Sequence, residues 1–442
     1  MRTTQRARCS ILILVALVAL IGAPAVAQEL VSGQEVTFTR DVAPIMQRSC
    51  VGCHRPDAVA PMSLRTYEEV RPWARSIKNR VQSREMPPWH LDRHIGIQTF
   101  KNDPSLTETE IATIVRWVDT GAKRGNPNDM PTLREFGDAD EWQIGEPDLI
   151  VEYPSYLVPA EGPDRFGNLF ASIDLTEDRY ISAIQTKPAD ERARLVVHHT
   201  NAFSVFPDEE AENGMESEQH LVEYASGKNA EIYPADSGVL LHAGSRARLS
   251  YHLHSVGEDI DTVVQLGFKF HPKGTVPDHV RWTKQLAGAG DGSSIAGIVD
   301  LPPGQVTRSD GYTRLSKAAR ITMFQPHMHF LGKYQCLELI YPTQPVKAEV
   351  VNCAHFDYNW HLAYNYADNS APLVPAGTIL HVINWHDNTA AHRGNPDPRN
   401  WSGSGGRTID EMGFAWIGWY DLTDEEYEAE LTARETARLK TN

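Results

Sequence analysis

The run Leu195-Val196-Val197-His198-His199-Thr200-Asn201-Ala202-Phe203-Ser204-Val205-Phe206 decides the fold of most of this chain. It is apolar and strand-like, and a Pro-Asp pair follows it directly. Similar short apolar or alternating runs recur between Gly, Pro and Asp clusters from about residue 140 onward. They are Asp148–Glu152, Arg246–His254, Val263–Phe270, Arg320–Met323 and Thr378–Trp385. This rhythm predicts β-sandwich or jelly-roll domains.

The strand-rich part is long enough for two domains. A loop-like stretch at Gly288–Ser294 is a natural divider, so we expect one all-β jelly-roll domain over residues 140–287 and another over 288–422. Residues 423–442 are rich in charge, and they form either a terminal helix or a solvated tail.

The residues before this region show helical patterns in place of strand-like ones. Residues 28–135 contain three amphipathic stretches, at Thr39–Arg48, Tyr67–Gln82 and Leu106–Thr120. Thr107 and Glu110 have the spacing of a helix capping box. The expected fold class is therefore multidomain, with an all-α domain over residues 28–135 followed by two all-β domains.

The first residues predict the compartment. Arg2, Arg6 and Arg8 precede an apolar run, and Ala25-Val26-Ala27 gives a small-x-small cleavage site. This is the layout of a signal peptide over residues 1–27, and it places the mature protein in the periplasm or outside the cell. An uncleaved N-terminal anchor is the alternative, and we expect no membrane span after cleavage. The net charge of −16 argues against nucleic-acid partners.

Cys50-Val51-Gly52-Cys53-His54 is a C-x-x-C-H motif. In this motif two thiols bind haem c covalently and the histidine becomes an axial iron ligand. A structural zinc site is the alternative, but no second cysteine pair lies nearby in the sequence. Of the other cysteines, Cys9 leaves with the leader. Cys336 and Cys353 then form either a disulfide or two buried thiols.

The second axial ligand of such a haem is expected among the methionines. Met86 lies in Arg84-Glu85-Met86-Pro87-Pro88-Trp89, where the prolines prevent a helix and force an extended loop. A thioether on such a loop can reach iron and raise its potential. These residues resemble the methionine loop of class I cytochromes c, which makes the helical domain cytochrome c-like. Met62 is the alternative ligand.

Histidines gather at three later places. These are His198-His199, His252-Leu253-His254 and His327-Met328-His329, and Asp410-Glu411-Met412 follows. Strand side chains at i and i+2 share a face, so His327 and His329 can grip one metal. Adjacent histidines such as His198 and His199 share a metal only through a bulge or through different ring nitrogens. A sulfur ligand beside imidazoles favours copper over zinc.

The order Val-His-His, His-x-His, His-x-His-x-x-Gly-Lys and Asp-Glu-Met resembles the ascorbate-dependent type II copper monooxygenases, which include peptidylglycine α-hydroxylating monooxygenase and dopamine β-monooxygenase. The resemblance spans roughly residues 145–422, and Asn395-Pro396-Asp397-Pro398 is similar to bacterial members of this family. It implies two copper ions on two jelly-roll domains that face a solvent-filled cleft. One copper, which transfers electrons, is expected on His198, His199 and His254. The catalytic copper, which activates O2, is expected on His327, His329 and Met412.

Two positions depart from the family pattern. A glutamine commonly stands where this chain has His252, so His252 remains an alternative to His254 as the third ligand. A tyrosine that helps to fix substrate in the peptide enzyme is replaced by Trp416. The remaining histidines of this region are expected in core, cleft or loop roles, with one of them able to orient a copper ligand. They are His355, His361, His381, His386 and His392.

The sequence thus predicts a secreted copper monooxygenase that hydroxylates a C–H bond of a small-molecule or peptide-like substrate. The second substrate is O2, and electrons come from a periplasmic donor or ascorbate through the haem. A non-catalytic haem and copper carrier is the first alternative, and a zinc hydrolase is the second.

Overall fold

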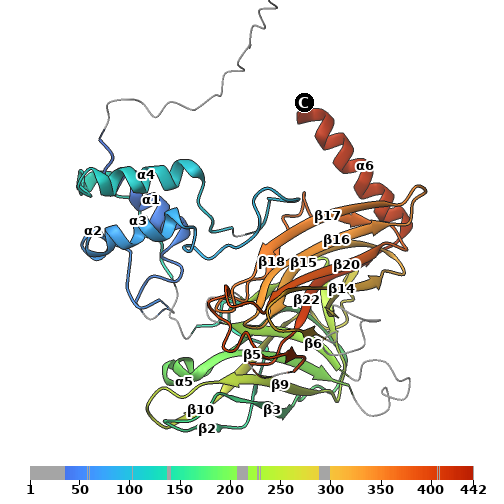
Figure 1. Cartoon of the computed structure of the whole chain (residues 1–442). Helices are drawn as coiled ribbons and strands as arrows, with labels where there is room; N and C mark the ends of the chain where they lie inside the picture. The colour runs from blue at the N-terminus through green and yellow to red at the C-terminus, as the bar shows by residue number, and fades with distance from the viewer. Residues whose placement is uncertain are drawn as a thin grey trace, which may run out of the picture.

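The computed structural model describes residues 35–441 except 57, 59, 102, 137–140, 207–217, 226–227, 229, 288–298, 406 and 408. Strands hold 39% of the described residues and helices hold 18%. Figure 1 shows two β bodies, one green to yellow and one orange to red, with a group of short helices in blue and cyan beside them. The predicted leader and the predicted divider at 288–294 lie outside the described residues.

The first β body is a sandwich. A four-stranded sheet of order β3-β9-β5-β6 faces strands β1, β11, β4 and β8, and the apolar core lies between them. The strands of the smaller sheet are β3 (Arg165–Ser172), β9 (Arg246–Leu253), β5 (Val197–Val205) and β6 (Glu218–Ala225). The facing strands are β1 (Leu149–Glu152), β11 (Val264–Phe270), β4 (Arg179–Pro188) and β8 (Ser237–Leu241).

The second β body repeats this plan. A sheet of order β14-β20-β16-β17 covers strands β12, β22, β15 and β18. The first four are β14 (Val306–Arg314), β20 (Ile379–Asp387), β16 (Gly332–Tyr341) and β17 (Lys347–His355). The others are β12 (His279–Ala287), β22 (Gly413–Leu422), β15 (Ala318–Met328) and β18 (Tyr364–Asn365).

One sheet is shared by both bodies. Strand β12 pairs in parallel with β8 and antiparallel with β22, so a ten-stranded sheet runs from the first body into the second. Short elements complete the two bodies. They are β2 (Tyr156–Val158), β7 (Glu231–Ile232), β10 (Ile260–Thr262), β13 (Asp300–Leu301), β19 (Leu373–Val374), β21 (Ser402–Gly403) and α5 (Glu191–Val196).

The helices of the N-terminal region lie where the amphipathic stretches predict them. They are η1 (Phe38–Val42), α1 (Ala43–Ser49), α2 (Tyr67–Val70), η2 (Arg71–Trp73), α3 (Ala74–Gln82), α4 (Glu108–Asp119) and η3 (Pro127–Asp129). Thr107 and Glu110 form the expected capping box at the start of α4. Phe38, Met46 and Trp117 are buried at the centre of this helical segment.

The prediction of an all-α cytochrome c-like domain over residues 28–135 is wrong. The α-helices there have only 7, 4, 9 and 12 residues, and no sizeable all-α domain is present in the described part of the chain. The stretch between α3 and α4 departs to the second β body, where Trp89, Leu91 and Phe100 join its core. Apolar burial against the β sandwich therefore outweighs burial among the helices for this stretch.

Three further features frame the site. Cys336 and Cys353 are opposite each other on β16 and β17, and they form the expected disulfide. The charged C-terminal stretch is helix α6 (Asp424–Thr441), and Arg320 and Glu430 join it to β15 by an ion pair. No helix among the described residues is long and apolar enough to cross a membrane.

Candidate metal centre

A β-bulge lets two adjacent histidines serve one site. The pairing of β5 with β9 shifts register between Val197 and His199, so His198 lies at the irregularity. On a regular strand the two side chains would point to opposite faces. Here Nδ1 of His198 and Nδ1 of His199 lie 3.1 Å apart, and both rings face the same space.

His252 completes this group. It is the direct cross-strand partner of His199, and each histidine of the trio offers a ring nitrogen within 4.8 Å of the other two. We call His198, His199 and His252 the three-histidine group. The ring of His254 lies farther out, with its centre 6.0 Å from that of His198, compared with 4.7 Å for His252. Among the described residues the histidines whose ligand atoms lie close together therefore include the alternative, His252, and the role of His254 as a copper ligand stays a prediction.

The three-histidine group is neutral and prepared for a cation. Burial lowers the pKa of His198 to about 4, and it also lowers the pKa values of His199 and His252. Nε2 of His252 donates to Oδ2 of Asp164 at 2.8 Å, so its Nδ1 carries the lone pair. That Nδ1 is buried and has no hydrogen-bond partner. In metal sites, a histidine ligand usually donates its other ring N–H to a carboxylate. The bond from His252 to Asp164 has this form, so these residues fit copper or another metal that binds imidazole.

The second group lies where β15 and β22 meet. His327 pairs with Phe414 and Met328 pairs with Gly413, and these two pairs are the last of the register between β15 and β22. His329 directly follows β15 and Met412 directly precedes β22, so both lie at the end of the sheet where His327 is found. We call His327, His329 and Met412 the two-histidine and methionine group.

Hydrogen bonds also orient residues of this second group. Nδ1 of His329 donates to the backbone oxygen of Asp410 at 2.8 Å, which leaves Nε2 with a lone pair. Nδ1 of His327 is buried without a partner, and burial holds the pKa of this ring well below its ordinary value. His386 donates from Nε2 to the backbone oxygen of Met412 at 2.9 Å and so positions it. These donors fit a soft metal with two nitrogen ligands and one sulfur ligand.

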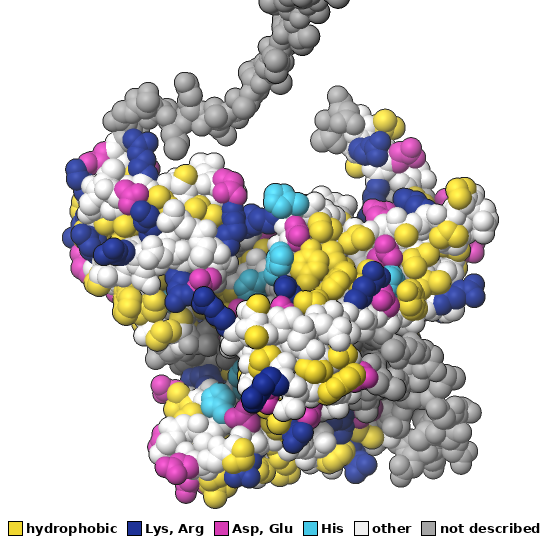
Figure 2. All heavy atoms as spheres, viewed as in Figure 1, with side chains coloured by type: hydrophobic (Ala, Val, Ile, Leu, Met, Phe, Trp, Pro, Cys, Tyr) yellow, Lys and Arg dark blue, Asp and Glu magenta, His cyan; other side chains and the backbone are white. Residues whose placement is uncertain are grey.

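His361 lies between the two groups. It is on the loop of residues 356–363, between β17 and β18, and it is 6% exposed. Its ring centre is 5.4 Å from that of His199 and 4.9 Å from that of His327. Tyr358 of the same loop stacks near His198 and packs against Phe330. Figure 2 shows histidine side chains in cyan where the helical segment meets the β bodies.

The C-x-x-C-H motif presents two free thiols and an oriented histidine. Cys50 and Cys53 are not joined to each other, and burial raises the pKa of Cys50 to about 12. Nδ1 of His54 donates to the backbone oxygen of Met62 at 3.2 Å, so Nε2 is left for an axial bond. These residues fit a covalently attached haem.

The two methionines near this motif differ in their surroundings. Met62 is partly buried against the helical core, and its backbone oxygen accepts a hydrogen bond from Nδ1 of His54. Met86 lines a small cavity between α3 and α4, with Val81, Leu106 and Ile111. The side chains of Met62 and Met86 therefore have different surroundings in the helical segment.

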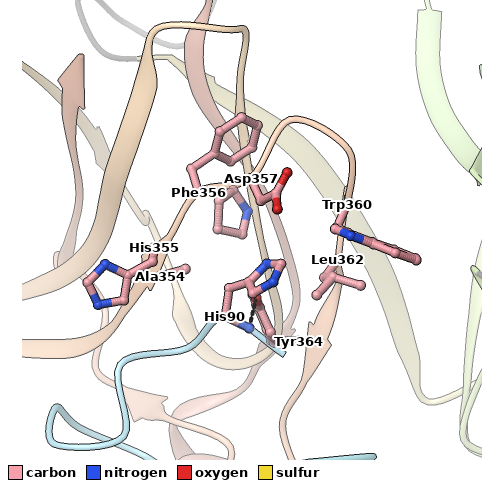
Figure 3. A pocket seen from close by; sticks show the side chains of 9 residues that line it. His90, Ala354, His355, Phe356, Asp357, Trp360, Leu362 and Tyr364 are labelled. Carbon is pink, nitrogen blue, oxygen red and sulfur yellow. Dashed lines mark hydrogen bonds between the residues drawn. The ribbon is translucent and has the colours of Figure 1, made fainter. Parts of the chain in front are cut away.

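The residues after Met86 connect the helical segment to the second β body. The ring of Trp89 lies edge-on to Tyr364, with 4.8 Å between the ring centres. The backbone N–H of His90 donates to the hydroxyl of Tyr364, and this bond is the dashed line in Figure 3. His90 and Tyr364 line a pocket with Asp357 and Trp360 of the 356–363 loop. The chain that follows Met86 is therefore in contact with the loop that carries His361.

Sequence reasoning missed several of these residues. Asp164 carries no local signal, because only the fold brings it to His252. His361 was expected in a core, cleft or loop role, and its contacts with both groups depend on the path of the 356–363 loop. His386 donates to the backbone oxygen of Met412, and an orienting role for it at a copper ligand stays a prediction.

Comparisons with known proteins do not identify a family. No family model matches this chain, and no curated protein matches it. One similar solved structure is an allantoicase from Saccharomyces cerevisiae, with 9% identity, coverage of 60% of this chain and 80% of that chain, and a TM-score of 0.17. Another is a tandem CBM22 domain of Xyn10C from Paenibacillus barcinonensis, with 9% identity, coverage of 61% and 93%, and a TM-score of 0.18. Likeness at this level carries no argument about fold or function.

Proposed function

We propose that this protein is a copper-dependent monooxygenase that hydroxylates a C–H bond of an organic substrate with O2. The observation that carries the proposal is the presence of two adjacent and different groups of donors. One contains three neutral histidines whose ligand atoms lie within 4.8 Å of one another, and the other has two histidines and a methionine at one end of the β15–β22 pair. The balanced reaction is R–H + O2 + 2e⁻ + 2H⁺ → R–OH + H2O. Bound copper would supply one-electron chemistry and O2 activation.

The protein residues would hold and orient the reacting partners. Asp164 fixes the tautomer of His252, and the Asp410 backbone does the same for His329. The apolar cluster around Met412 contains Phe203, Phe414 and Trp416. It would receive an apolar part of the substrate and exclude water from the reacting carbon.

Cys50, Cys53 and His54, with Met86 as the expected further ligand, would hold a haem, which would supply one-electron transfer. The packing of Trp89 against Tyr364 supports this role, because it joins the helical segment to the second β body. Covalent connection of donor and acceptor also keeps their effective concentration high.

The first test is the metal content of the chain expressed in a periplasm with haem-maturation machinery. After copper loading and removal of excess, the proposal expects two coppers and one iron per chain. Reduced protein is then incubated with a panel of apolar organic compounds under ¹⁸O2, and hydroxylated products are sought by mass spectrometry. Copper and haem without any labelled product would favour an electron-transfer or copper-carrier protein. Zinc in place of copper would contradict both functions.

A matched pair of variants tests the second group. Met412→Leu should abolish formation of labelled product and leave the haem spectrum intact. Met328→Leu changes the same residue type on the opposite strand face, where the side chain is fully buried, and should retain product formation. Equal loss in both variants would assign the effect to packing, and undiminished product in Met412→Leu would remove this group from the reaction.

A further inference from the structure

Glu411 is a buried carboxylate beside the two-histidine and methionine group. It directly precedes Met412 in the sequence, and it is only 1% exposed. Its Oε1 accepts the backbone N–H of Leu331 at 2.9 Å. Leu331 follows His329 by two residues, and the backbone of His329 lies close enough to act on the same carboxyl group. One side chain therefore connects the segment that contains Met412 with the segment that contains His329.

Both ends of this connection are fixed to the second β body. The backbone oxygen of Leu331 accepts the N–H of Asp387 at 2.7 Å, and the side chain of Leu331 is buried. The backbone N–H of Glu411 donates to the oxygen of Gly403 at 2.9 Å. Because neither end is loose, the bond between Glu411 and Leu331 sets the position of one segment relative to the other.

Three consecutive backbone oxygens that follow Glu411 are bonded to buried side chains of the facing sheet. The bonds are those from His386 to Met412 at 2.9 Å, from Asn384 to Gly413 at 3.4 Å and from Gln335 to Phe414 at 2.9 Å. All three donor side chains belong to residues with no exposed surface. The start of β22 is therefore held at successive residues from the opposite sheet.

These polar side chains stand where the rest of the sandwich has apolar ones. Leu337 and Leu339 follow Gln335 at alternate positions of β16 and are buried in the apolar core, as are Leu380 and Val382 before Asn384 on β20. Both strands change from apolar to polar at the end of the sheet where Met412 lies. Burial of a carboxyl or amide group costs free energy unless hydrogen bonds replace those of water, so packing alone would favour apolar residues here.

We infer that Glu411 is a positioning residue of the two-histidine and methionine group, which holds the Met412 segment against the His329 segment through its bond to the backbone of Leu331. This inference rests on the proposed function and adds to it a residue that is not itself a ligand. A thioether binds copper weakly, so its contribution depends on a position that the protein fixes before the metal binds. The donors from the facing sheet keep the backbone of residues 412–414 in place, and Glu411 sets its position relative to His329.

Two conservative changes separate the reach of this side chain from its charge. Glu411→Gln loses the charge but keeps the length and an oxygen that can accept from Leu331. Glu411→Asp keeps the charge but is one methylene shorter, so its oxygen no longer reaches the same N–H. Glu338→Asp is the matched control, because it shortens a carboxylate of the same β body that binds Nδ1 of His381.

The measurements use the copper-loaded holoprotein and do not depend on activity. A chelator titration gives the affinity for each copper, and the sulfur contribution to the X-ray absorption spectrum of the Cu(I) protein reports whether Met412 is bound. In Glu411→Asp one of the two coppers should bind about 10–100-fold more weakly, with a smaller sulfur contribution. Glu411→Gln and Glu338→Asp should resemble wild type in both quantities, and the other copper should keep its affinity in every protein.

Wild-type affinity and sulfur contribution in Glu411→Asp would overturn the inference. A loss in Glu411→Gln as large as that in Glu411→Asp would also overturn it, because the effect would then come from the charge and not from the hydrogen bond. Equal weakening of both coppers in Glu411→Asp would indicate general damage to the fold and would have the same consequence. Affinities in the expected order, with no labelled product from any of these proteins, would contradict the proposed function alone.

Discussion

Oδ2 of Asp164 lies 2.8 Å from Nε2 of His252, and the two residues come from chain segments that are 88 positions apart. The contact selects one tautomer of His252 and directs the free Nδ1 toward His198 and His199. Asp164 is thus part of the three-histidine group although it contributes no ligand atom to it. The contact also gives His252 a support that His254 does not have among the described hydrogen bonds.

The first prediction concerns this carboxylate. Asp164→Asn should weaken copper binding at the three-histidine group by about 10–100-fold, because the amide no longer enforces the tautomer or raises the basicity of the ring. Competition with a chelator of known affinity measures the change. Asp261→Asn, an exposed change on β10 of the same β body, is the control. Unchanged affinity in Asp164→Asn would show that His252 is not a ligand.

The second prediction separates the two methionines near the haem motif. Met86→Ala should lower the midpoint potential of the haem, because loss of a thioether ligand removes its preference for reduced iron. Met62→Ala should leave the potential near the wild-type value, since His54 bonds to the backbone oxygen of Met62, which this change keeps. Redox titration of the two holoproteins checks this, and the reverse order of effects would reassign the ligand.

The third prediction concerns the disulfide of the second β body. Cys336 and Cys353 are 17 positions apart in the sequence, and their link shortens the loop that the unfolded chain can explore. Cys336→Ala together with Cys353→Ala should lower the free energy of unfolding by about 3 kcal/mol. Denaturant unfolding measures it. Reducing agent should destabilise wild type to a similar extent and leave the double variant unchanged; destabilisation of both would point to another cause.

The fourth prediction is a pH dependence that arises from His220. Burial holds the pKa of His220 well below 6.5, and its ring stacks on Trp416 with 4.1 Å between centres. The unfolded chain therefore binds the extra proton first, and this contribution to stability is lost as the pH falls below 6.5. At pH 5.5 the loss from this one group is about 1.4 kcal/mol.

The variant His220→Phe keeps a ring against Trp416 and removes the titration. Its thermal stability should fall less than that of wild type between pH 7.5 and pH 5.5, as measured by calorimetry. A parallel change, His279→Phe, removes a histidine that also stacks on an aromatic ring, that of Tyr420, but is only partly buried. Equal pH dependence in wild type and His220→Phe would mean that folding does not lower the pKa of His220.

The sequence by itself determined the local features of this protein. Apolar and alternating runs located some of the strands, among them β1, β5, β9, β11 and β20, and the Thr107–Glu110 spacing located the start of α4. It also set His327 and His329 two apart, and left Cys336 and Cys353 as the two cysteines that can form a disulfide. Each of these features depends on residues that are close along the chain or on one cross-strand pair. Such short-range patterns can be recognised from the sequence alone.

Tertiary structure alone decided the rest. The segment from Trp89 to Phe100 packs on the second β body, which buries its apolar side chains, and not on the helices. This packing is the reason why the expected all-α domain is not found among the described residues. The bulge at His198 and the register of β5 with β9 brought His252 to the three-histidine group. The loop of residues 356–363 set His361 between both groups. These outcomes depend on which distant surfaces pack together, and spacing along the chain does not carry that information.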